Sequence, residues 1–349
     1  MSLYQRTPSQ VMSDVIECMM VGLVPMVASS PGLGKSSIYF QIAKDYRLWP
    51  IDLRLSQCTP EDLMGLPMRT KDGNKASFVP FNMFPLVGDT LPEGYDGWML
   101  ILDEFNSATK AVQAAAYKLV FDRMVGQEKL HENVVTVCAG NLATDRAIVN
   151  SLSTAMQSRL VHIEMVASPP DFLAHAHKNN FDTRVSGFIE FQPSYLHQFK
   201  PDHQDKTFAC PRTWEFASKL IKGKPFKDVN LALLAGTLSE GVAIVFHTFL
   251  KEFDSLPAFK DIMADPGGTI VPDKTSTRHA LLTMILEYVD DTSFENISKY
   301  LKRFPPEMQV MYFRGVVQRF PKMKETQIFA ENILHLTRFF NEDEFSLAA

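Results

Sequence analysis

The residues from Met26 to Phe40, MVASSPGLGKSSIYF, have the types and spacing of a loop that binds phosphate groups. Glycines permit the sharp turn that points backbone amides at phosphate oxygens, and the helix that follows adds the positive end of its dipole. A lysine supplies a positive charge to the outer phosphates, and a Ser or Thr hydroxyl binds magnesium. The residues expected to bind nucleotide are Ser30, Pro31, Gly32, Leu33, Gly34, Lys35, Ser36 and Ser37.

One position departs from the usual pattern G-x-x-x-x-G-K-[ST], because Ser29 stands where the first glycine belongs. A small residue can adopt the turn at the point where the loop leaves the strand, so we interpret Ser29 as a tolerated variant. The alternative is a glycine-rich turn followed by a surface lysine, with no nucleotide chemistry.

Two acids, Asp103 and Glu104, come at the end of the apolar run WMLILDEF. In an open parallel sheet, ligands bind at the carboxyl ends of the strands. Asp103 could therefore hold magnesium through water, and Glu104 could orient and deprotonate an attacking water. The alternative is a strand end with two solvated acids.

Two further polar residues follow later strands. The run NVVTVCAGN brings Asn141 to the same end of the sheet, where its amide could hydrogen-bond the attacking water or the last phosphate; a turn or capping asparagine is the alternative. Arg159, in LSTAMQSRLVHI, lies between a helix and a strand. Exposed on a subunit face, it could reach a neighbour's phosphate as an arginine finger.

The elements that must position these residues alternate along the first half of the chain. Thr7 or Ser9 caps the first expected helix. Strands are expected at residues 24–29, 49–56, 98–105, 133–141 and 161–166, and helices at residues 7–20, 36–46 and 110–124. Such alternation predicts an α/β fold with a parallel sheet covered on both faces.

The remaining segments suggest how the chain is divided. Residues 59–97 contain five prolines, and so long a connection must either carry function or fold into an inserted element. The chain becomes helix-rich from about Ser168, and we expect domains at residues 1–167, 168–253 and 254–349. The apolar stretch 231–250 is interrupted by Glu240 and His247, which favours a buried helix over a membrane span.

Composition excludes several classes of protein. The chain of 349 residues is 46% hydrophobic with a formal net charge of -5, which argues mildly against nonspecific nucleic-acid binding. Its four cysteines lie far apart, so neither a disulfide framework nor a zinc cluster is expected. The polar start MSLYQRTPSQ does not read as a signal peptide, and we expect a cytoplasmic protein with no membrane association.

The phosphate loop, LILDEF, AGN and SRL, in this order and approximate spacing, resemble an AAA+ ATPase, and more closely its MoxR-like group. Three longer segments extend the resemblance, which covers about residues 8 to 225. They are LSQCTPEDLMGLP, with Thr59, Asp62, Leu63 and Gly65; LSTAMQSRL, with Ala155 and Arg159; and CPRTWEFASKL, which resembles the Ser-Pro-Arg of the lid domain and makes Arg212 the sensor-2 candidate. Ser29, Ser153, Ser158 and Cys210 depart from the family pattern.

The resemblance implies a parallel-sheet P-loop core, an α-helical lid and a helical C-terminal extension, with ATP and Mg²⁺ as cofactors. It assigns Lys35 and Ser36 to phosphate and magnesium, Asp103 to magnesium, Glu104 to the catalytic base, Asn141 to sensor 1, Arg159 to action on the next subunit and Arg212 to action from the lid. Arg146 or Arg123 could share or take the role of Arg159.

The resemblance further implies a homo-oligomer, commonly a hexameric ring, that remodels a protein client and works with a von Willebrand A-type partner. An ATP-hydrolysing motor or chaperone-like ATPase is thus the expected function. The alternative is a nucleic-acid-associated AAA+ ATPase, such as a helicase loader or translocase, for which Arg69, Lys71 and Lys75 are the candidate contacts. A slowly hydrolysing, nucleotide-gated scaffold is a third possibility.

Overall fold

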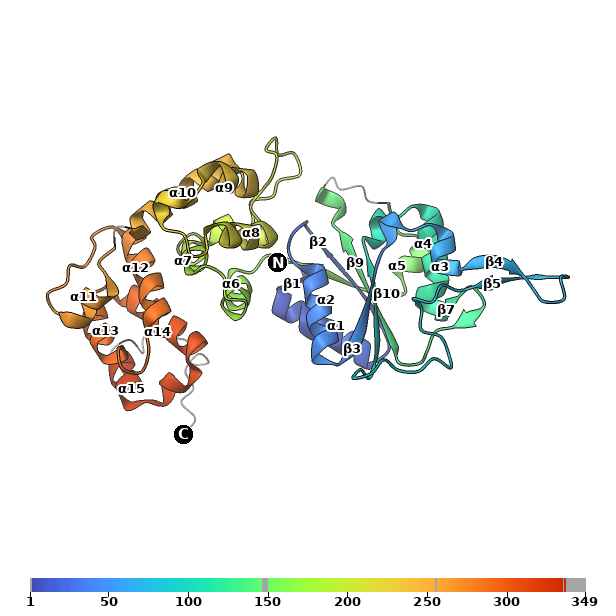
Figure 1. The fold of residues 1–349 in the computed structure, drawn as a ribbon, viewed down its shortest axis with the longest axis horizontal. Coiled ribbons are helices and arrows are strands. Elements are labelled where there is room, and N and C mark those ends of the chain that lie inside the picture. Colours follow the sequence, from blue (N-terminus) through green and yellow to red (C-terminus); the bar gives the residue numbers. More distant parts are fainter. Residues whose placement is uncertain (1, 146–149, 255, 335, 337–349) are drawn as a thin grey trace. The chain divides into compact units, whose positions relative to one another are not determined.

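A computed structural model describes residues 2–145, 150–254, 256–334 and 336. Arg146, one of the predicted finger candidates, lies outside these residues. The chain divides into two compact units, which we describe separately (Figure 1). The first unit comprises Met1–Ser168 and Phe199–Gln204, and the second comprises Pro169–Gln198 and Asp205–Ala349.

The first unit is built on a parallel sheet with the strand order β1-β10-β2-β9-β6-β3. Its strands are β1 (Gln5–Arg6), β2 (Val24–Ser29), β3 (Leu48–Arg54), β6 (Gly97–Asp103), β9 (Val134–Asn141) and β10 (Leu160–Met165). The register pairs Ser29 with Asn141 and Arg54 with Asp103, so the carboxyl ends of these strands meet at one end of the sheet. The predicted α/β fold is confirmed; the short β1, which pairs with β10, is not among the predicted strands.

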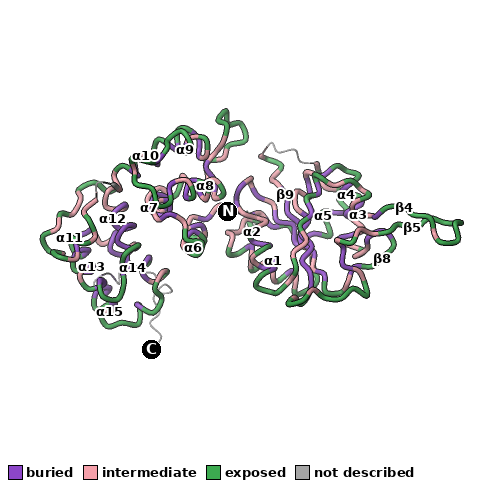
Figure 2. Tube along the Cα trace, viewed as in Figure 1, coloured by how far each residue is buried: buried purple, intermediate pink, exposed green. Residues whose placement is uncertain are grey.

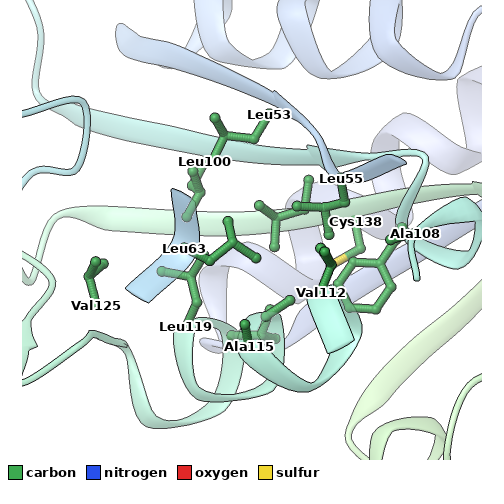
Figure 3. Close-up of a cluster of buried hydrophobic side chains, with 14 of the residues drawn as sticks. Leu53, Leu55, Leu63, Leu100, Ala108, Val112, Ala115, Leu119, Val125 and Cys138 are labelled. Atoms are coloured by element: carbon green, nitrogen blue, oxygen red, sulfur yellow. The ribbon is translucent and has the colours of Figure 1, made fainter. Parts of the chain in front are cut away.

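Apolar side chains of successive strand residues point to opposite faces of the sheet, and helices cover both. Met99 and Ile101 of β6 pack with α1 (Pro8–Met20) and α2 (Lys35–Asp45) on one face. Leu100 and Leu102 belong to the cluster on the other face, and Figure 3 shows part of this cluster between the strands and the helix that carries Val112 and Ala115. That face is covered by α3 (Pro60–Met64), α4 (Lys110–Tyr117), the π-helical turn η3 (Lys118–Asp122) and α5 (Thr154–Gln157). Burial on both sides explains why these strands are continuous apolar runs.

Residues 59–97 fold into an inserted helix and hairpin. Thr59 and Asp62 form a capping box that starts α3, and Leu63 is buried beneath it. Strands β4 (Leu66–Arg69) and β5 (Ala76–Val79) then pair antiparallel, and the hairpin projects from the sheet (Figure 1). Nearly all of its residues are exposed (Figure 2).

Gly65 explains how the chain enters this hairpin. Its φ of 87° lies in the left-handed region, and a Cβ at this position would overlap the backbone of Val79 and Pro80. A second small hairpin follows α4, between β7 (Met124–Val125) and β8 (Glu128–Lys129). Short 3₁₀ turns complete the unit at η1 (Leu55–Gln57), η2 (Phe105–Ser107) and η4 (Ala143–Asp145).

The second unit contains helices and connecting loops, with no strand among its described residues. Its α-helices are α6 (Pro169–Lys178), α7 (Thr183–Phe191), α8 (Pro211–Ile221), α9 (Leu231–Leu238), α10 (Glu240–Asp254), α11 (Phe259–Ala264), α12 (Thr275–Tyr288), α13 (Phe294–Leu301), α14 (Pro306–Arg319) and α15 (Gln327–Ile333). Three 3₁₀ turns, η5 (Pro193–Leu196), η6 (Phe226–Asp228) and η7 (Pro321–Glu325), connect them. Helix α7 packs closely on α12, because Gly187 leaves room for Thr283. The division of this region near residue 253 stays a prediction.

The apolar stretch 231–250 differs from the single buried helix predicted for it. It forms α9 and α10, which are separated at Ser239, whose φ is 84°. Leu233 and Ile244 are about half exposed, at 51% and 50%. Among the described residues, no helix has both the length and the apolar character needed to cross a membrane.

Candidate active site

The predicted phosphate loop lies between the end of β2 and the start of α2. Gly32 and Gly34 have φ values of 79° and 93°, which glycine adopts without steric penalty. A Cβ on Gly34 would meet no atom within 4 Å, so the loop is open at this point. Leu33 between them is buried in the cluster formed with α1 and α2, and it anchors the loop to the sheet.

The flanking loop residues have different surroundings. Ser30 accepts a hydrogen bond through its backbone oxygen from Ser29 Oγ at 2.9 Å. Ser30 and Pro31 are partly buried, whereas Ser37, in the first turn of α2, is exposed. The loop, the strand before it and the helix after it thus have the arrangement that the motif requires.

Lys35 joins the loop to two strand ends. Its Nζ donates to Ser29 O at 3.2 Å, to Ser29 Oγ at 3.0 Å and to Asn141 Oδ1 at 3.4 Å. Ser29 is fully buried, so its hydroxyl is a fixed acceptor for the ammonium group. The residue that replaces the first glycine of the motif therefore contacts the lysine of the motif.

Ser36 and Asp103 form a hydrogen-bonded pair of oxygen ligands. Ser36 Oγ donates to Asp103 Oδ2 at 2.7 Å, and both are the hard oxygen donors that Mg²⁺ prefers. On the adjacent strand, burial raises the pKa of Asp52; the nearby charge of Asp103 adds to this rise and Arg54 opposes it. The carboxyl groups of Asp52 and Asp103 are thus close enough at this end of the sheet to interact electrostatically.

The described residues contain no group of three or more His, Cys, Asp and Glu that could hold a metal ion. A cation at Ser36 and Asp103 would therefore take its remaining ligands from phosphate oxygens or water. Mg²⁺ is commonly bound in this way, through one or two protein oxygens together with substrate phosphates.

Glu104 follows Asp103 but is held in a different direction. Its φ is 54°, which is uncommon for a residue with a side chain. Its backbone N–H donates to Asp103 Oδ1 at 2.7 Å, and its Oε2 accepts a hydrogen bond from Ser56 Oγ, just beyond β3. The sequence prediction did not include Ser56, although its place after β3 puts it beside the acids that follow β6.

Asn141 is fixed by a second asparagine that the sequence prediction missed. Asn141 N donates to Asn106 Oδ1 at 3.0 Å, and Asn106 Nδ2 donates to Asn141 O at 2.7 Å. A Cβ on Gly140 would lie 2.5 Å from Asn106 Oδ1, so only glycine permits this approach. The signal in the sequence is a polar residue three positions after Asp103 that the fold buries to 8% exposure.

The arginine candidates have contrasting environments. Arg159 is exposed and donates through Nη1 to Ala155 O at 3.0 Å. Arg123 donates to the backbone oxygens of residues 131, 132 and 134 at 2.9, 3.2 and 2.9 Å, so its guanidinium is committed to the fold. Arg212 is exposed in the first turn of α8, in the second unit.

The structure therefore forms two hydrogen-bonded pairs at consecutive residues of the loop, Lys35 with Asn141 and Ser36 with Asp103, and the backbone of Glu104 donates to Asp103. The members come from the first turn of α2 and from the ends of two neighbouring strands, β6 and β9. The roles expected of Arg159 and Arg212 involve a bound nucleotide and, for Arg159, a neighbouring subunit, and they stay predictions.

No family model and no curated protein matches the chain. Among solved structures, a protein from Cytophaga hutchinsonii described as a candidate ATPase is 11% identical, with a TM-score of 0.36 over 97% of this chain and 91% of that chain. Two variants of RuvB from Thermotoga maritima are 15% and 14% identical, with TM-scores of 0.33 and 0.34. These matches cover 95% and 94% of this chain and 91% and 85% of the RuvB chains. Similarities this low carry no inference about activity.

Proposed function

We propose that this chain is a P-loop ATPase of the AAA+ type that hydrolyses ATP with Mg²⁺. The observation that carries the proposal is the presence of two hydrogen-bonded pairs, Lys35 with Asn141 and Ser36 with Asp103, side by side at the open phosphate loop. Each supplies a part that phosphoryl transfer needs, namely positive charge, magnesium ligands and a polar contact to the last phosphate.

ATP binding would replace hydrogen bonds within the chain by contacts to the phosphates and to Mg²⁺. The amides of the loop and the N-terminus of α2 would take the phosphates. Lys35 would leave Ser29 Oγ and donate to a phosphate oxygen instead. Ser36 and Asp103 would hold Mg²⁺, which supplies neutralisation of the charge that develops on the phosphates.

Hydrolysis would use Glu104, the acid whose side chain is not hydrogen-bonded to Ser36 of α2. Glu104 would accept a proton from the attacking water, and its hydrogen bond with Ser56 would restrict the direction of the carboxylate. Asn141, which Asn106 holds in place, would orient the water or the last phosphate. Positioning and charge neutralisation supply most of the catalysis in this class of reaction.

Two arginines would complete the site. We propose that Arg159 acts on the nucleotide of a neighbouring subunit in a ring, commonly of six copies. It is preferred over Arg123, whose guanidinium would have to break three hydrogen bonds to backbone oxygens. Arg212, from the second unit, would act on the nucleotide of its own subunit.

The finer proposal is a MoxR-like ATPase that remodels a protein client, with a von Willebrand A-type partner. Support comes from the projecting β4–β5 hairpin, which exposes Leu66, Met68 and Val79 to a client. The second candidate, a nucleic-acid-associated ATPase, is favoured by the exposed cations Arg69, Lys71 and Lys75 on the same hairpin. Stimulation of ATP hydrolysis by DNA or RNA, lost as salt rises, would select the second candidate.

The direct test is ATP turnover by the purified protein. We expect Lys35→Ala to abolish ATP binding and turnover, whereas Lys44→Ala, which removes an exposed lysine in the last turn of the same helix, should leave both unchanged. Absence of turnover in the wild type, even with partners present, together with unchanged nucleotide binding by Lys35→Ala, would overturn the proposal.

A further inference from the structure

The guanidinium of Arg159 lies over two aromatic rings. Its Cζ is 5.2 Å from the ring centroid of Tyr117 and 5.8 Å from that of Phe121. The two rings contact each other edge to face, with centroids 4.8 Å apart. Together with the hydrogen bond from Nη1 to Ala155 O, these contacts define where the charged group stands.

The rings themselves are firmly supported. Tyr117 ends α4, and Phe121 lies in the π-helical turn η3, a rare element that is frequent at functional sites. Both rings are partly buried and pack against the core cluster of Figure 3. Leu119 and Val120, between them, are buried at 0% and 4% exposure. The surface beneath Arg159 is therefore a fixed part of the core.

Within the part of the chain that the structure describes, no carboxylate forms an ion pair with Arg159. The ion pairs found among the described residues all involve other cations. Aromatic faces attract a guanidinium without neutralising it, and they leave its N–H groups at the edge free to donate. An exposed arginine held in this way keeps both its charge and its donors for an anion such as phosphate.

We infer that Tyr117 and Phe121 are positioning residues that present Arg159 to the nucleotide of a neighbouring subunit. This inference rests on the proposed function, and it adds that two aromatic rings set the direction of the arginine side chain. The two rings restrict the long side chain to one orientation before the neighbour binds, so less conformational entropy is lost in the active complex. Loss of the two rings should therefore lower the rate of ATP turnover and leave nucleotide affinity unchanged.

The test mixes two kinds of subunit. Arg159→Ala subunits keep an intact catalytic site but provide no arginine, and Glu104→Gln subunits provide Arg159 but have no catalytic base. Mixing them should restore ATP hydrolysis in the Arg159→Ala sites. The donor subunit itself does not hydrolyse ATP. A substitution of its aromatic rings can therefore change the measured rate only by changing how its Arg159 acts on the neighbouring Arg159→Ala subunit.

We expect Glu104→Gln donors that also carry Phe121→Leu to restore about three- to tenfold less activity, and Tyr117→Leu donors likewise. Donors with Tyr117→Phe, which keeps the ring, should restore full activity, as should donors with Tyr4→Leu, which removes an exposed tyrosine before β1. Nucleotide affinity and thermal unfolding of each donor are measured alongside, and only donors that match the parent in both are compared.

The outcomes separate this inference from the proposed function. Equal restoration by donors with and without the rings would overturn the role of Tyr117 and Phe121 while leaving the ATPase proposal intact. Failure of any donor to restore activity, when the wild type hydrolyses ATP, would overturn the action of Arg159 between subunits, and the inference with it. Absence of ATP hydrolysis in the wild type would instead overturn the proposed function itself.

Discussion

At the scale of single residues, the site is defined by hydrogen bonds that ATP would have to exchange. Ser29 shows this most clearly, because its buried hydroxyl accepts from Lys35 Nζ at 3.0 Å. A glycine at this position would offer the lysine only a backbone oxygen. The departure from the sequence motif thus has a specific physical consequence, which is competition with phosphate for the lysine.

Ser29→Ala should therefore tighten ATP binding. Removal of one hydrogen-bond acceptor lowers the free energy needed to release Lys35 by about 1 kcal/mol, which corresponds to about fivefold in the dissociation constant. Equilibrium titration with a fluorescent ATP analogue measures this. Weaker binding by Ser29→Ala would show instead that the hydroxyl supports the bound state.

Ser56 provides the second prediction at this scale. Its hydroxyl donates to Glu104 Oε2, and a carboxylate held in this way is less free to turn toward the attacking water. We expect Ser56→Ala to raise the basal rate of ATP hydrolysis by about two- to fivefold with no change in ATP affinity. A reduced rate at unchanged affinity would mean that Ser56 positions the base productively.

At the scale of elements, the segment Thr59–Gly65 starts a helix and then turns the chain into the hairpin. The capping box fixes the start of α3, Leu63 anchors it, and Gly65 permits close approach to the backbone of Val79. The residues that carry the family resemblance here therefore have a structural role. They attach the projecting hairpin to the core.

Gly65→Ala should loosen this attachment. The added Cβ would overlap backbone atoms at a left-handed φ, and we expect a loss of about 1–3 kcal/mol in unfolding free energy. Trypsin should then cleave faster after Lys71 and Lys75. The matched control is Gly73→Ala, where φ is also positive at 71° but a Cβ meets no atom within 4 Å. Equal effects of the two substitutions would contradict this account.

Glu190 on α7 gives a prediction about the second unit. Burial raises its pKa from 4.5 to about 7. Between these two values the folded state holds a proton that the unfolded state has lost, so unfolding free energy falls as pH rises through this range. A shift of this size corresponds to a loss on the order of 3 kcal/mol.

Glu190→Gln should remove this dependence. Urea unfolding at pH 5, 6.5 and 8 should show the wild type losing stability relative to the variant, which should be the more stable of the two at pH 8. Parallel pH profiles for the two proteins would show that the carboxyl group is solvated.

At the scale of the whole molecule, the sequence predicts those elements whose environment is uniform. Strands β2, β6 and β9 are mostly apolar on both faces and follow directly from their composition. The hairpin strands β4 and β5 are exposed on both faces and give no periodic signal. Strand β1 has two residues, and its pairing with β10 depends on the folded sheet.

In the candidate site, too, some residues can be predicted from the sequence and others cannot. Its loop residues and the acids after β6 are recognisable because each lies at the end of an apolar strand or within a glycine-rich turn. Ser56 and Asn106 are polar residues close to strand ends, but the sequence does not show that they contact Glu104 and Asn141. The contact of Arg159 with Tyr117 and Phe121 likewise joins residues far apart in the sequence. Likewise, the break at Ser239 that divides α9 from α10 interrupts an otherwise uniform apolar run.

The central claim is that Glu104 is the base for hydrolysis of ATP bound at the loop around Lys35. The most direct measurement compares phosphate release and bound ATP in the same samples of wild type and Glu104→Gln. We expect Glu104→Gln to bind Mg-ATP as tightly as the wild type and to release phosphate at about 1% of the wild-type rate or less. Equal rates of phosphate release by the two proteins would contradict it.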